Sequence, residues 1–130
     1  MEIFLIFISQ NFIAVTILLF AVLGLIVHES RRGGERVDPS QATNVINKQG
    51  GTLVDLRAEN EFNSGHISGS INCERLEEIE EKLTETDKED SIVLVCQNGS
   101  SSKKAGLKLK KLGYSKIYII QNGIMGWKAQ

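Results

Sequence analysis

The sequence predicts a small α/β domain with helices on both faces of a parallel sheet, preceded by one transmembrane helix. Short aliphatic and β-branched runs alternate with segments of helical spacing over residues 38–130. Such alternation is typical of a parallel sheet covered on both faces. A separate run, residues 3–27, holds no charged side chain. The chain has 130 residues, which allows one domain of ordinary size beside that run.

The composition excludes several classes of function. Fifteen Lys and Arg balance sixteen Asp and Glu, giving a formal net charge of −1. A nucleic-acid partner is therefore not expected, because such binders normally carry a basic excess. Two cysteines and two histidines are too few for a disulfide framework or a four-cysteine zinc site. We also expect no metal.

Residues 1–28 are predicted to form a transmembrane anchor that enters the membrane through residues 3–27. A helix over that uncharged run extends about 37 Å, and a hydrocarbon core is about 30 Å thick. The polar patch Ser9-Gln10-Asn11 interrupts the apolar run and moves the expected start of the membrane span toward residue 11. The alternative is a cleaved signal peptide, which normally begins with basic residues and ends in a small-residue cleavage site. Neither feature is present, so the uncleaved anchor is favoured.

The flanks of the anchor predict its orientation. Arg31, Arg32 and Arg36 follow the apolar run and no basic residue precedes it. Positive flanks stay in the cytoplasm, so the amino terminus is expected outside and the remaining domain inside. That compartment also keeps both cysteines as thiols. Residues 29–37 contain Gly33-Gly34 and are interpreted as a flexible linker.

The domain at 38–130 begins with a helix and a strand. The helix start at Asp38-Pro39-Ser40 combines a capping aspartate with a proline in the first turn. Ala42 and Val45 lie on one face of this helix, and Gly50-Gly51 ends it. The apolar run Thr52–Leu56 then predicts a buried strand.

The alternation continues to the carboxyl terminus. A charged loop is predicted after the first strand, and the clearest strand of the chain is Ser91–Cys96. The other predicted elements are a short strand over 70–73, a helix on Leu76, Ile79 and Leu83, a helix on Ala105, Leu109 and Leu112 that ends at Gly113, a strand over 116–120, and a final helix with Trp127.

Cys96 is the residue at which the sequence points to chemistry. It ends a buried strand and precedes a helix, and sites in parallel sheets lie at the carboxyl ends of strands. Gly99 is free to take a positive φ, so this short loop can turn its N–H groups inward. A thiolate would accept those hydrogen bonds and would be stabilised by the partial positive charge of the helix terminus. The residues expected to surround a substrate here are Gln97, Asn98, Gly99, Ser100, Ser101 and Ser102.

The other reactive side chains have structural interpretations. Cys96 itself could be an inert core residue, although the loop favours a reactive one. Cys73 is predicted to be a buried core thiol, and His66 a packed turn residue. Asp55 and Arg57 support the site, more through an ion pair or a cap than through substrate contact.

Three segments carry a resemblance to a known family. They are Val54–Arg57 with Glu61–Asn72, the loop Cys96–Ser102, and Asn122–Trp127. Together they resemble the rhodanese family of sulfurtransferases over about residues 38–130. The anchor followed by ESRRGG also resembles the membrane-anchored single-domain rhodaneses of bacteria, which implies a location at the inner membrane.

The resemblance implies a relay of sulfane sulfur. Cys96 would take sulfur from thiosulfate or a persulfide donor, hold it as a persulfide, and pass it to a thiol or to cyanide. It implies no metal or organic cofactor. The expected partners are a small sulfur-donor anion or a persulfide-carrying protein, and the sequence identifies no specific protein partner.

Two departures from the family pattern leave alternatives open. Many active members carry Arg at the fifth position after the cysteine, where this chain has Ser101, and Asn122 replaces the first glycine of the closing motif. A catalytically idle module that acts as a membrane-tethered interaction domain is therefore the alternative. A cysteine phosphatase is less favoured, because Ser102 stands where its phosphate-binding arginine is required.

Overall fold

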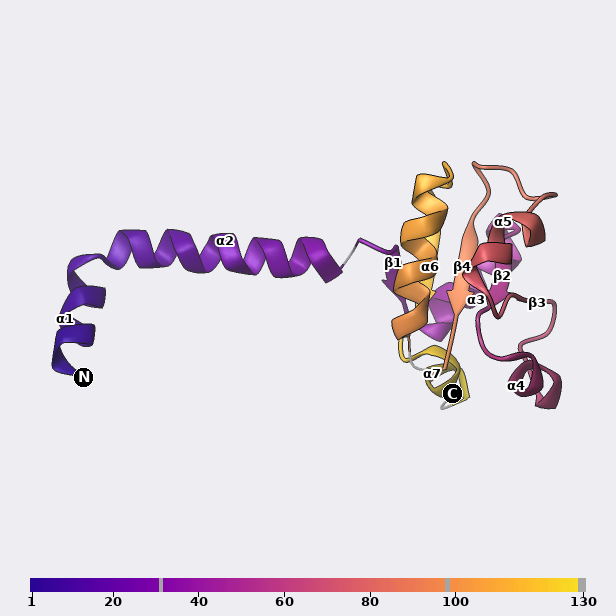
Figure 1. Ribbon diagram of the computed structural model, residues 1–130, viewed down its shortest axis with the longest axis horizontal. Helices are drawn as coiled ribbons and strands as arrows, with labels where there is room; N and C mark the ends of the chain where they lie inside the picture. Colours follow the sequence, from indigo (N-terminus) through magenta and orange to yellow (C-terminus); the bar gives the residue numbers. More distant parts are fainter. Residues whose placement is uncertain (31, 98, 129–130) are drawn as a thin grey trace. The chain divides into compact units, whose positions relative to one another are not determined.

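The computed structural model describes residues 1–30, 32–97 and 99–128 and divides the chain into two compact units. One unit is 1–31 and the other is 32–130 (Figure 1). Two residues named above, Arg31 and Asn98, lie outside the described residues. The compact domain thus begins about six residues before the expected boundary at 38.

The amino-terminal unit is two helices rather than one continuous helix. Helix α1 covers Glu2–Gln10 and α2 covers Phe12–Ser30. They meet at Asn11 with an angle of 87°, and only the two together have the length and apolar composition of a membrane span. Within the described residues, neither helix alone does. The side chains of Ser9 and Asn11 both donate to backbone carbonyls of α1, a competition with the helical pattern that explains a break at this polar patch.

The second unit contains a five-stranded sheet whose paired strands are all parallel, as predicted. The strands lie in the order β1-β5-β4-β2-β3. Their bounds are β1 Glu35–Val37, β2 Thr52–Asp55, β3 Ile71–Asn72, β4 Ile92–Val95 and β5 Ile117–Ile120. Because the pairs are parallel, the carboxyl ends of all five strands meet at one edge of the sheet.

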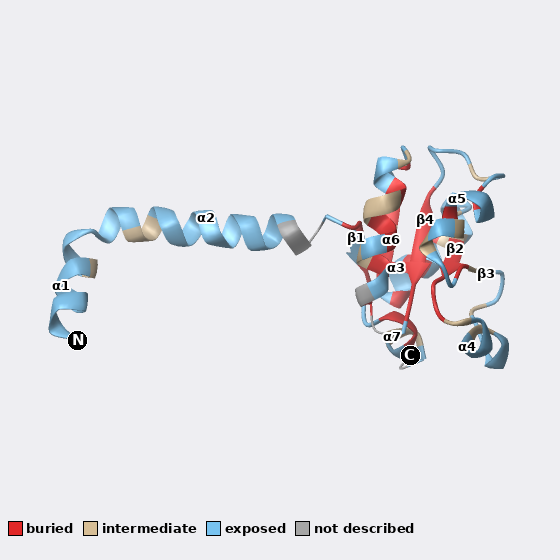
Figure 2. Ribbon diagram, in the orientation of Figure 1, coloured by how far each residue is buried: buried red, intermediate tan, exposed pale blue. Residues whose placement is uncertain are grey.

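Helices cover both faces of this sheet, as predicted. Successive residues of a strand point to opposite faces. Val93 and Val95 pack in one buried cluster with α3 and α7, whereas Ile92 and Leu94 pack in a second cluster with α5 and α6. Figure 2 shows β4 buried between these layers. The helices are α3 Pro39–Gln49, α4 Glu59–Ser64, the 3₁₀ turn η1 Leu76–Glu78, α5 Ile79–Lys82, α6 Ser100–Lys111 and α7 Gly123–Lys128.

The expected linker at 29–37 is partly a strand. Residues Glu35–Val37 form β1, which pairs with the edge of β5. The preceding Gly33 lies directly against α6, since a Cβ built on Gly106 would stand 1.6 Å from the Gly33 carbonyl oxygen. The two glycines therefore serve close packing rather than flexibility.

The charged loop predicted after β2 is also partly ordered. It contains α4, whose amino-terminal Ala58 supplies no side-chain cap. The segment is closed instead by Arg57, whose Nη2 donates to the carbonyl of Gly65 at the end of the helix. This tertiary contact has no local sequence signal, which is why the helix was missed.

Candidate active site

Cys96 follows β4 directly and lies at the carboxyl edge of the sheet. Only 3% of the residue is exposed. Its backbone is fixed from both sides, because the carbonyl of Val95 accepts from Leu56 N–H at 2.8 Å and that of Cys96 accepts from Ile124 N–H at 2.7 Å. The first contact comes from the end of β2 and the second from α7. The sulfur is therefore held on a rigid frame.

The Cys96 sulfur accepts a backbone hydrogen bond. Gly99 N–H donates to Sγ at 2.9 Å. Gly99 caps the twelve-residue helix α6 with a φ of 97°, a left-handed conformation that favours glycine. The predicted inward turn of the loop is confirmed at this residue. An acceptor role, beside the positive end of a helix, suits a sulfur that carries negative charge.

The other predicted loop residues are placed unequally by the structure. Gln97 and Ser101 are exposed. Asn98 lies outside the described residues, and the side chain of Ser100 is likewise not described. Ser102 is fully buried in the first turn of α6, and its Oγ has no hydrogen-bond partner among the described residues. Buried hydroxyls without a partner are uncommon in folded proteins.

Cys73 makes the opposite kind of hydrogen bond. Its Sγ donates to the carbonyl of Arg75 at 3.1 Å, which requires a protonated thiol. The residue is 1% exposed, and burial raises the pKa of the Cys73 thiol above its usual value. The prediction of a buried core thiol is confirmed. The chain therefore contains two buried cysteines with opposite hydrogen-bonding roles: the Cys96 sulfur accepts and the Cys73 thiol donates.

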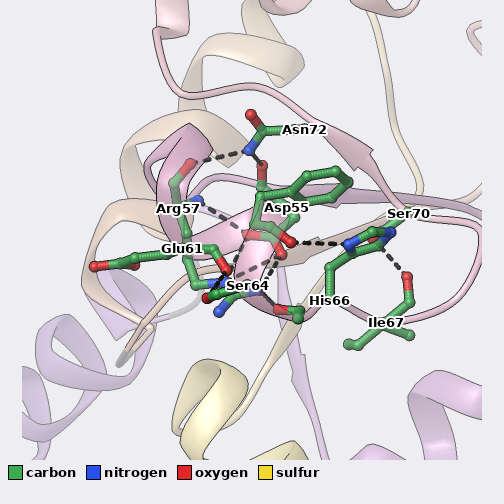
Figure 3. A network of polar contacts seen from close by, with 10 residues as sticks. Asp55, Arg57, Glu61, Ser64, His66, Ile67, Ser70 and Asn72 are labelled. Atoms are coloured by element: carbon green, nitrogen blue, oxygen red, sulfur yellow. Dashed lines mark hydrogen bonds and ion pairs between the residues drawn. The ribbon is translucent and has the colours of Figure 1, made fainter.

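Asp55 and Arg57 form a buried ion pair at the end of β2, where Asp55 lies in register with Val95, the residue before Cys96. Arg57 donates from Nε to both Asp55 carboxylate oxygens at 3.1 Å and from Nη2 to Oδ2 at 2.8 Å (Figure 3). The same Nη2 donates to the Gly65 carbonyl at 2.7 Å. These bonds to Asp55 raise the pKa of Arg57.

The same network continues into β3. Asn72 donates from Nδ2 to the carbonyls of Asp55 and Arg57, at 3.2 and 3.0 Å. His66 lies beside it, stacked on Phe62 with ring centroids 3.8 Å apart. The contacts of Asp55 and Arg57 are thus with each other and with backbone, as expected of an ion pair that orders the fold.

The sequence analysis did not identify Arg36 as a residue of the site, because it assigned residues 29–37 to a linker. The structure puts Arg36 Nη1 3.7 Å from the position that a Cβ on Gly99 would occupy. The arginine therefore reaches the active-site loop from β1. Only the pairing of β1 with β5 brings these residues together, so no local pattern could have indicated it. Among the described residues, no group of three or more His, Cys, Asp or Glu could hold a metal ion.

Comparison with known proteins identifies the family. Residues 38–130 match the sequence profile of the rhodanese-like domain. The chain belongs to this family. The rhodanese match thus covers the whole predicted domain, and leaves out β1 and the glycines that precede it in the compact unit.

Several known proteins show moderate sequence identity to the chain. It is 33% identical over 95 residues to the thiosulfate sulfurtransferase GlpE of Pseudomonas savastanoi pv. phaseolicola, covering 73% of this chain and 88% of GlpE. It is 30% identical over 92 residues to the protein YibN of Escherichia coli K12, covering 69% of this chain and 64% of YibN. The chain thus spans slightly under two thirds of YibN.

Solved structures show the same fold. A crystal structure of reduced Bacillus anthracis CoADR-RHD superposes with a TM-score of 0.60 at 31% identity, over 72% of this chain and 16% of that one. A rhodanese-like domain protein from Staphylococcus aureus gives a TM-score of 0.61 over 72% of this chain and 90% of that one. Its identity is 19%, so this second likeness concerns the fold alone.

Proposed function

We propose that this chain is a sulfurtransferase in which Cys96 carries the transferred sulfur as a persulfide. The hydrogen bond from Gly99 N–H to Cys96 Sγ is the observation that carries this proposal. It presents the sulfur as an acceptor at the amino end of α6, where negative charge is favoured. Membership of the rhodanese-like family and the identity to relatives named thiosulfate sulfurtransferase support it.

The reaction is two displacements on sulfur. The Cys96 thiolate attacks the outer sulfur of thiosulfate, the S–S bond of the donor breaks, and its electron pair leaves with sulfite. The products are a Cys96 persulfide anion and sulfite, so atoms and charge balance. An acceptor thiolate or cyanide then attacks the terminal sulfur, and the electron pair of the broken bond returns to Cys96 as thiolate. A persulfide-carrying protein or small persulfide could replace thiosulfate as the donor.

The loop stabilises charge on the sulfur throughout the cycle. The Gly99 N–H is fixed by the helix, so no reorganisation is needed when charge moves onto the terminal sulfur. The Ser102 hydroxyl, which has no hydrogen-bond partner among the described residues, lies in the first turn of the same helix. We assign it the role of a hydrogen-bond donor to the persulfide or to the bound donor.

The membrane part of the proposal concerns residues 1–28. They would anchor the domain at the inner membrane, with the amino terminus outside and the domain in the cytoplasm. The uncharged run and the arginines after it support this arrangement. The test is protease treatment of intact spheroplasts and of opened membranes. The domain should be digested only after opening, and digestion in intact spheroplasts contradicts the orientation.

Activity is tested by thiocyanate formation from thiosulfate and cyanide, using the full chain in mild detergent. Cys96→Ser should abolish the reaction. Cys73→Ser is the matched control and should retain it, because a serine hydroxyl can still donate to the Arg75 carbonyl.

One observation favours a second candidate, the catalytically idle interaction module. Ser101 stands where many active members have arginine, so the loop itself carries no cation. If the folded wild-type chain transfers no sulfur from thiosulfate or from an organic persulfide, the idle module is the correct description.

A further inference from the structure

An anionic donor needs a positive group near Cys96, and the loop from Gln97 to Ser102 contains none. Thiosulfate carries much of its negative charge on the sulfonate oxygens, two bonds from the outer sulfur that the nucleophile attacks. A cation that binds this group must therefore lie a few ångströms from Sγ. The described structure places one such side chain against the loop, and it comes from β1.

The geometry of β1 aims Arg36 at the start of α6. Val37 is buried in the cluster that faces α3, so the preceding Arg36 points to the opposite face of the sheet, where α6 lies. Its Nη1 is 3.7 Å from the Cβ position of Gly99, the residue whose N–H binds Cys96 Sγ. Both ends of this link are fixed, because Arg36 is paired in register with Ile119 of β5.

The charges around this position leave it open to an anion. Arg36 is exposed, and within the described part of the chain no ion pair or hydrogen bond engages its side chain. Its neighbour Glu35 lies on the other face, in a groove with Gln41 and Tyr118. The guanidinium thus stands beside the partial positive charge of the amino end of α6, while the carboxylate of Glu35 lies on the other face. Two positive groups at one edge attract an anion more strongly than either alone.

We infer that Arg36 is the substrate-binding cation of this site and selects donors whose transferable sulfur is attached to an anionic group, such as thiosulfate. The inference rests on the proposed function for its substrate. The positive charge that the loop lacks is thus supplied by β1, which lies outside the stretch that matches the family profile.

The test compares two alkylating probes of similar size at Cys96. Iodoacetate carries a carboxylate beside its reacting carbon, as thiosulfate carries a sulfonate beside its outer sulfur, and iodoacetamide is its neutral counterpart. Both form a thioether and release iodide, so neither needs sulfur transfer. Rates are measured on the full chain in mild detergent, with mass spectrometry of peptides to separate Cys96 from Cys73.

Arg36→Gln should lower the iodoacetate rate at Cys96 about five- to tenfold, the effect of one charge a few ångströms away in a partly screened site. It should leave the iodoacetamide rate within about twofold, since neutral probes feel little of that charge. Arg36→Lys should keep most of the preference. Lys116→Gln is the matched control: it removes one positive charge just before β5, at the opposite edge of the sheet, and should change neither rate. Raising the salt concentration should lower the ratio of the iodoacetate rate to the iodoacetamide rate in the wild type and not in Arg36→Gln.

Each result decides the inference. An unchanged iodoacetate-to-iodoacetamide ratio in Arg36→Gln overturns it, and so does an equal fall in Lys116→Gln. A fall of both probe rates in Arg36→Gln, together with a fall in Arg36→Lys, also overturns it, because the loop rather than the charge has then changed. If the ratio falls as expected but no sulfur is transferred, the anion site stands and the proposed function fails. If sulfur is transferred but the ratio is unchanged, the proposed function stands without Arg36.

Discussion

The buried ion pair of Asp55 and Arg57 allows its structural role to be measured separately from catalysis. The two side chains are 0% and 4% exposed, and three hydrogen bonds join them. Arg57→Leu removes the cation and leaves the Asp55 carboxylate buried without a counter-charge. Loss of one partner of a buried pair destabilises a protein by about 3–5 kcal/mol. That value includes the loss of the hydrogen bond from Arg57 to the Gly65 carbonyl.

The double variant Asp55→Asn/Arg57→Leu separates charge from shape. The asparagine introduced at position 55 is neutral, and its side-chain oxygen can still accept from the backbone N–H of residue 57, as Asp55 Oδ1 does at 3.0 Å. We therefore expect the double variant to lose only about 1–2 kcal/mol, the size of the remaining unmade hydrogen bonds. It should be more stable than Arg57→Leu alone.

The assay is urea unfolding of the full chain in mild detergent, followed by fluorescence. Trp127 is the only tryptophan of the sequence and packs against the core cluster of α3 and α7, so its emission reports on this domain. If the double variant is no more stable than the single one, the stabilisation does not come from an uncompensated buried charge. If Arg57→Leu is as stable as the wild type but loses activity, the pair binds substrate instead of ordering the fold.

Three further predictions use the same preparations. Gly106→Ala should destabilise the domain by about 3 kcal/mol in urea, because the added Cβ meets the Gly33 carbonyl, while Gly24→Ala, with open space around it, should not. Ser102→Ala should raise the free energy of unfolding by about 1 kcal/mol and lower thiocyanate formation, since it removes a partnerless buried hydroxyl; a loss of stability contradicts this. The raised pKa of Cys73 predicts that iodoacetamide at pH 8 labels Cys96 before Cys73. It also predicts that the free energy of unfolding falls as the pH rises above about 8.5, because the Cys73 thiol then ionises in the unfolded chain and not in the folded one.

Strands β2, β4 and β5 were predictable because each is a short, mostly apolar run whose residues are largely buried. β4, with four fully buried residues, is the extreme case. Helix α3 was predictable from its capping residues, and the structure shows the reciprocal bonds between Asp38 and Gln41 that make a capping box. The position of Cys96 and the left-handed Gly99 followed from the strand-to-helix transition.

The features that were missed depend on contacts between distant segments. β1 has three residues, of which only Val37 is buried, so it has no strand pattern of its own and exists through pairing with β5. The place of Arg36 beside Gly99 follows from that pairing. Helix α4 depends on the bond from Arg57 to Gly65. The bend at Asn11 was indicated only as a polar interruption, because hydropathy alone does not distinguish a break from a surface-facing turn.

The most direct measurement is the mass of the chain after incubation with thiosulfate, with the modified peptide identified without reductant. The proposed mechanism predicts one added sulfur atom on the peptide that contains Cys96, and none on the peptide that contains Cys73. Cyanide should then remove that sulfur as thiocyanate, and Cys96→Ser should never acquire it. An unmodified Cys96 in a folded chain that has been offered thiosulfate and an organic persulfide, or a sulfur atom found on Cys73 instead, contradicts it.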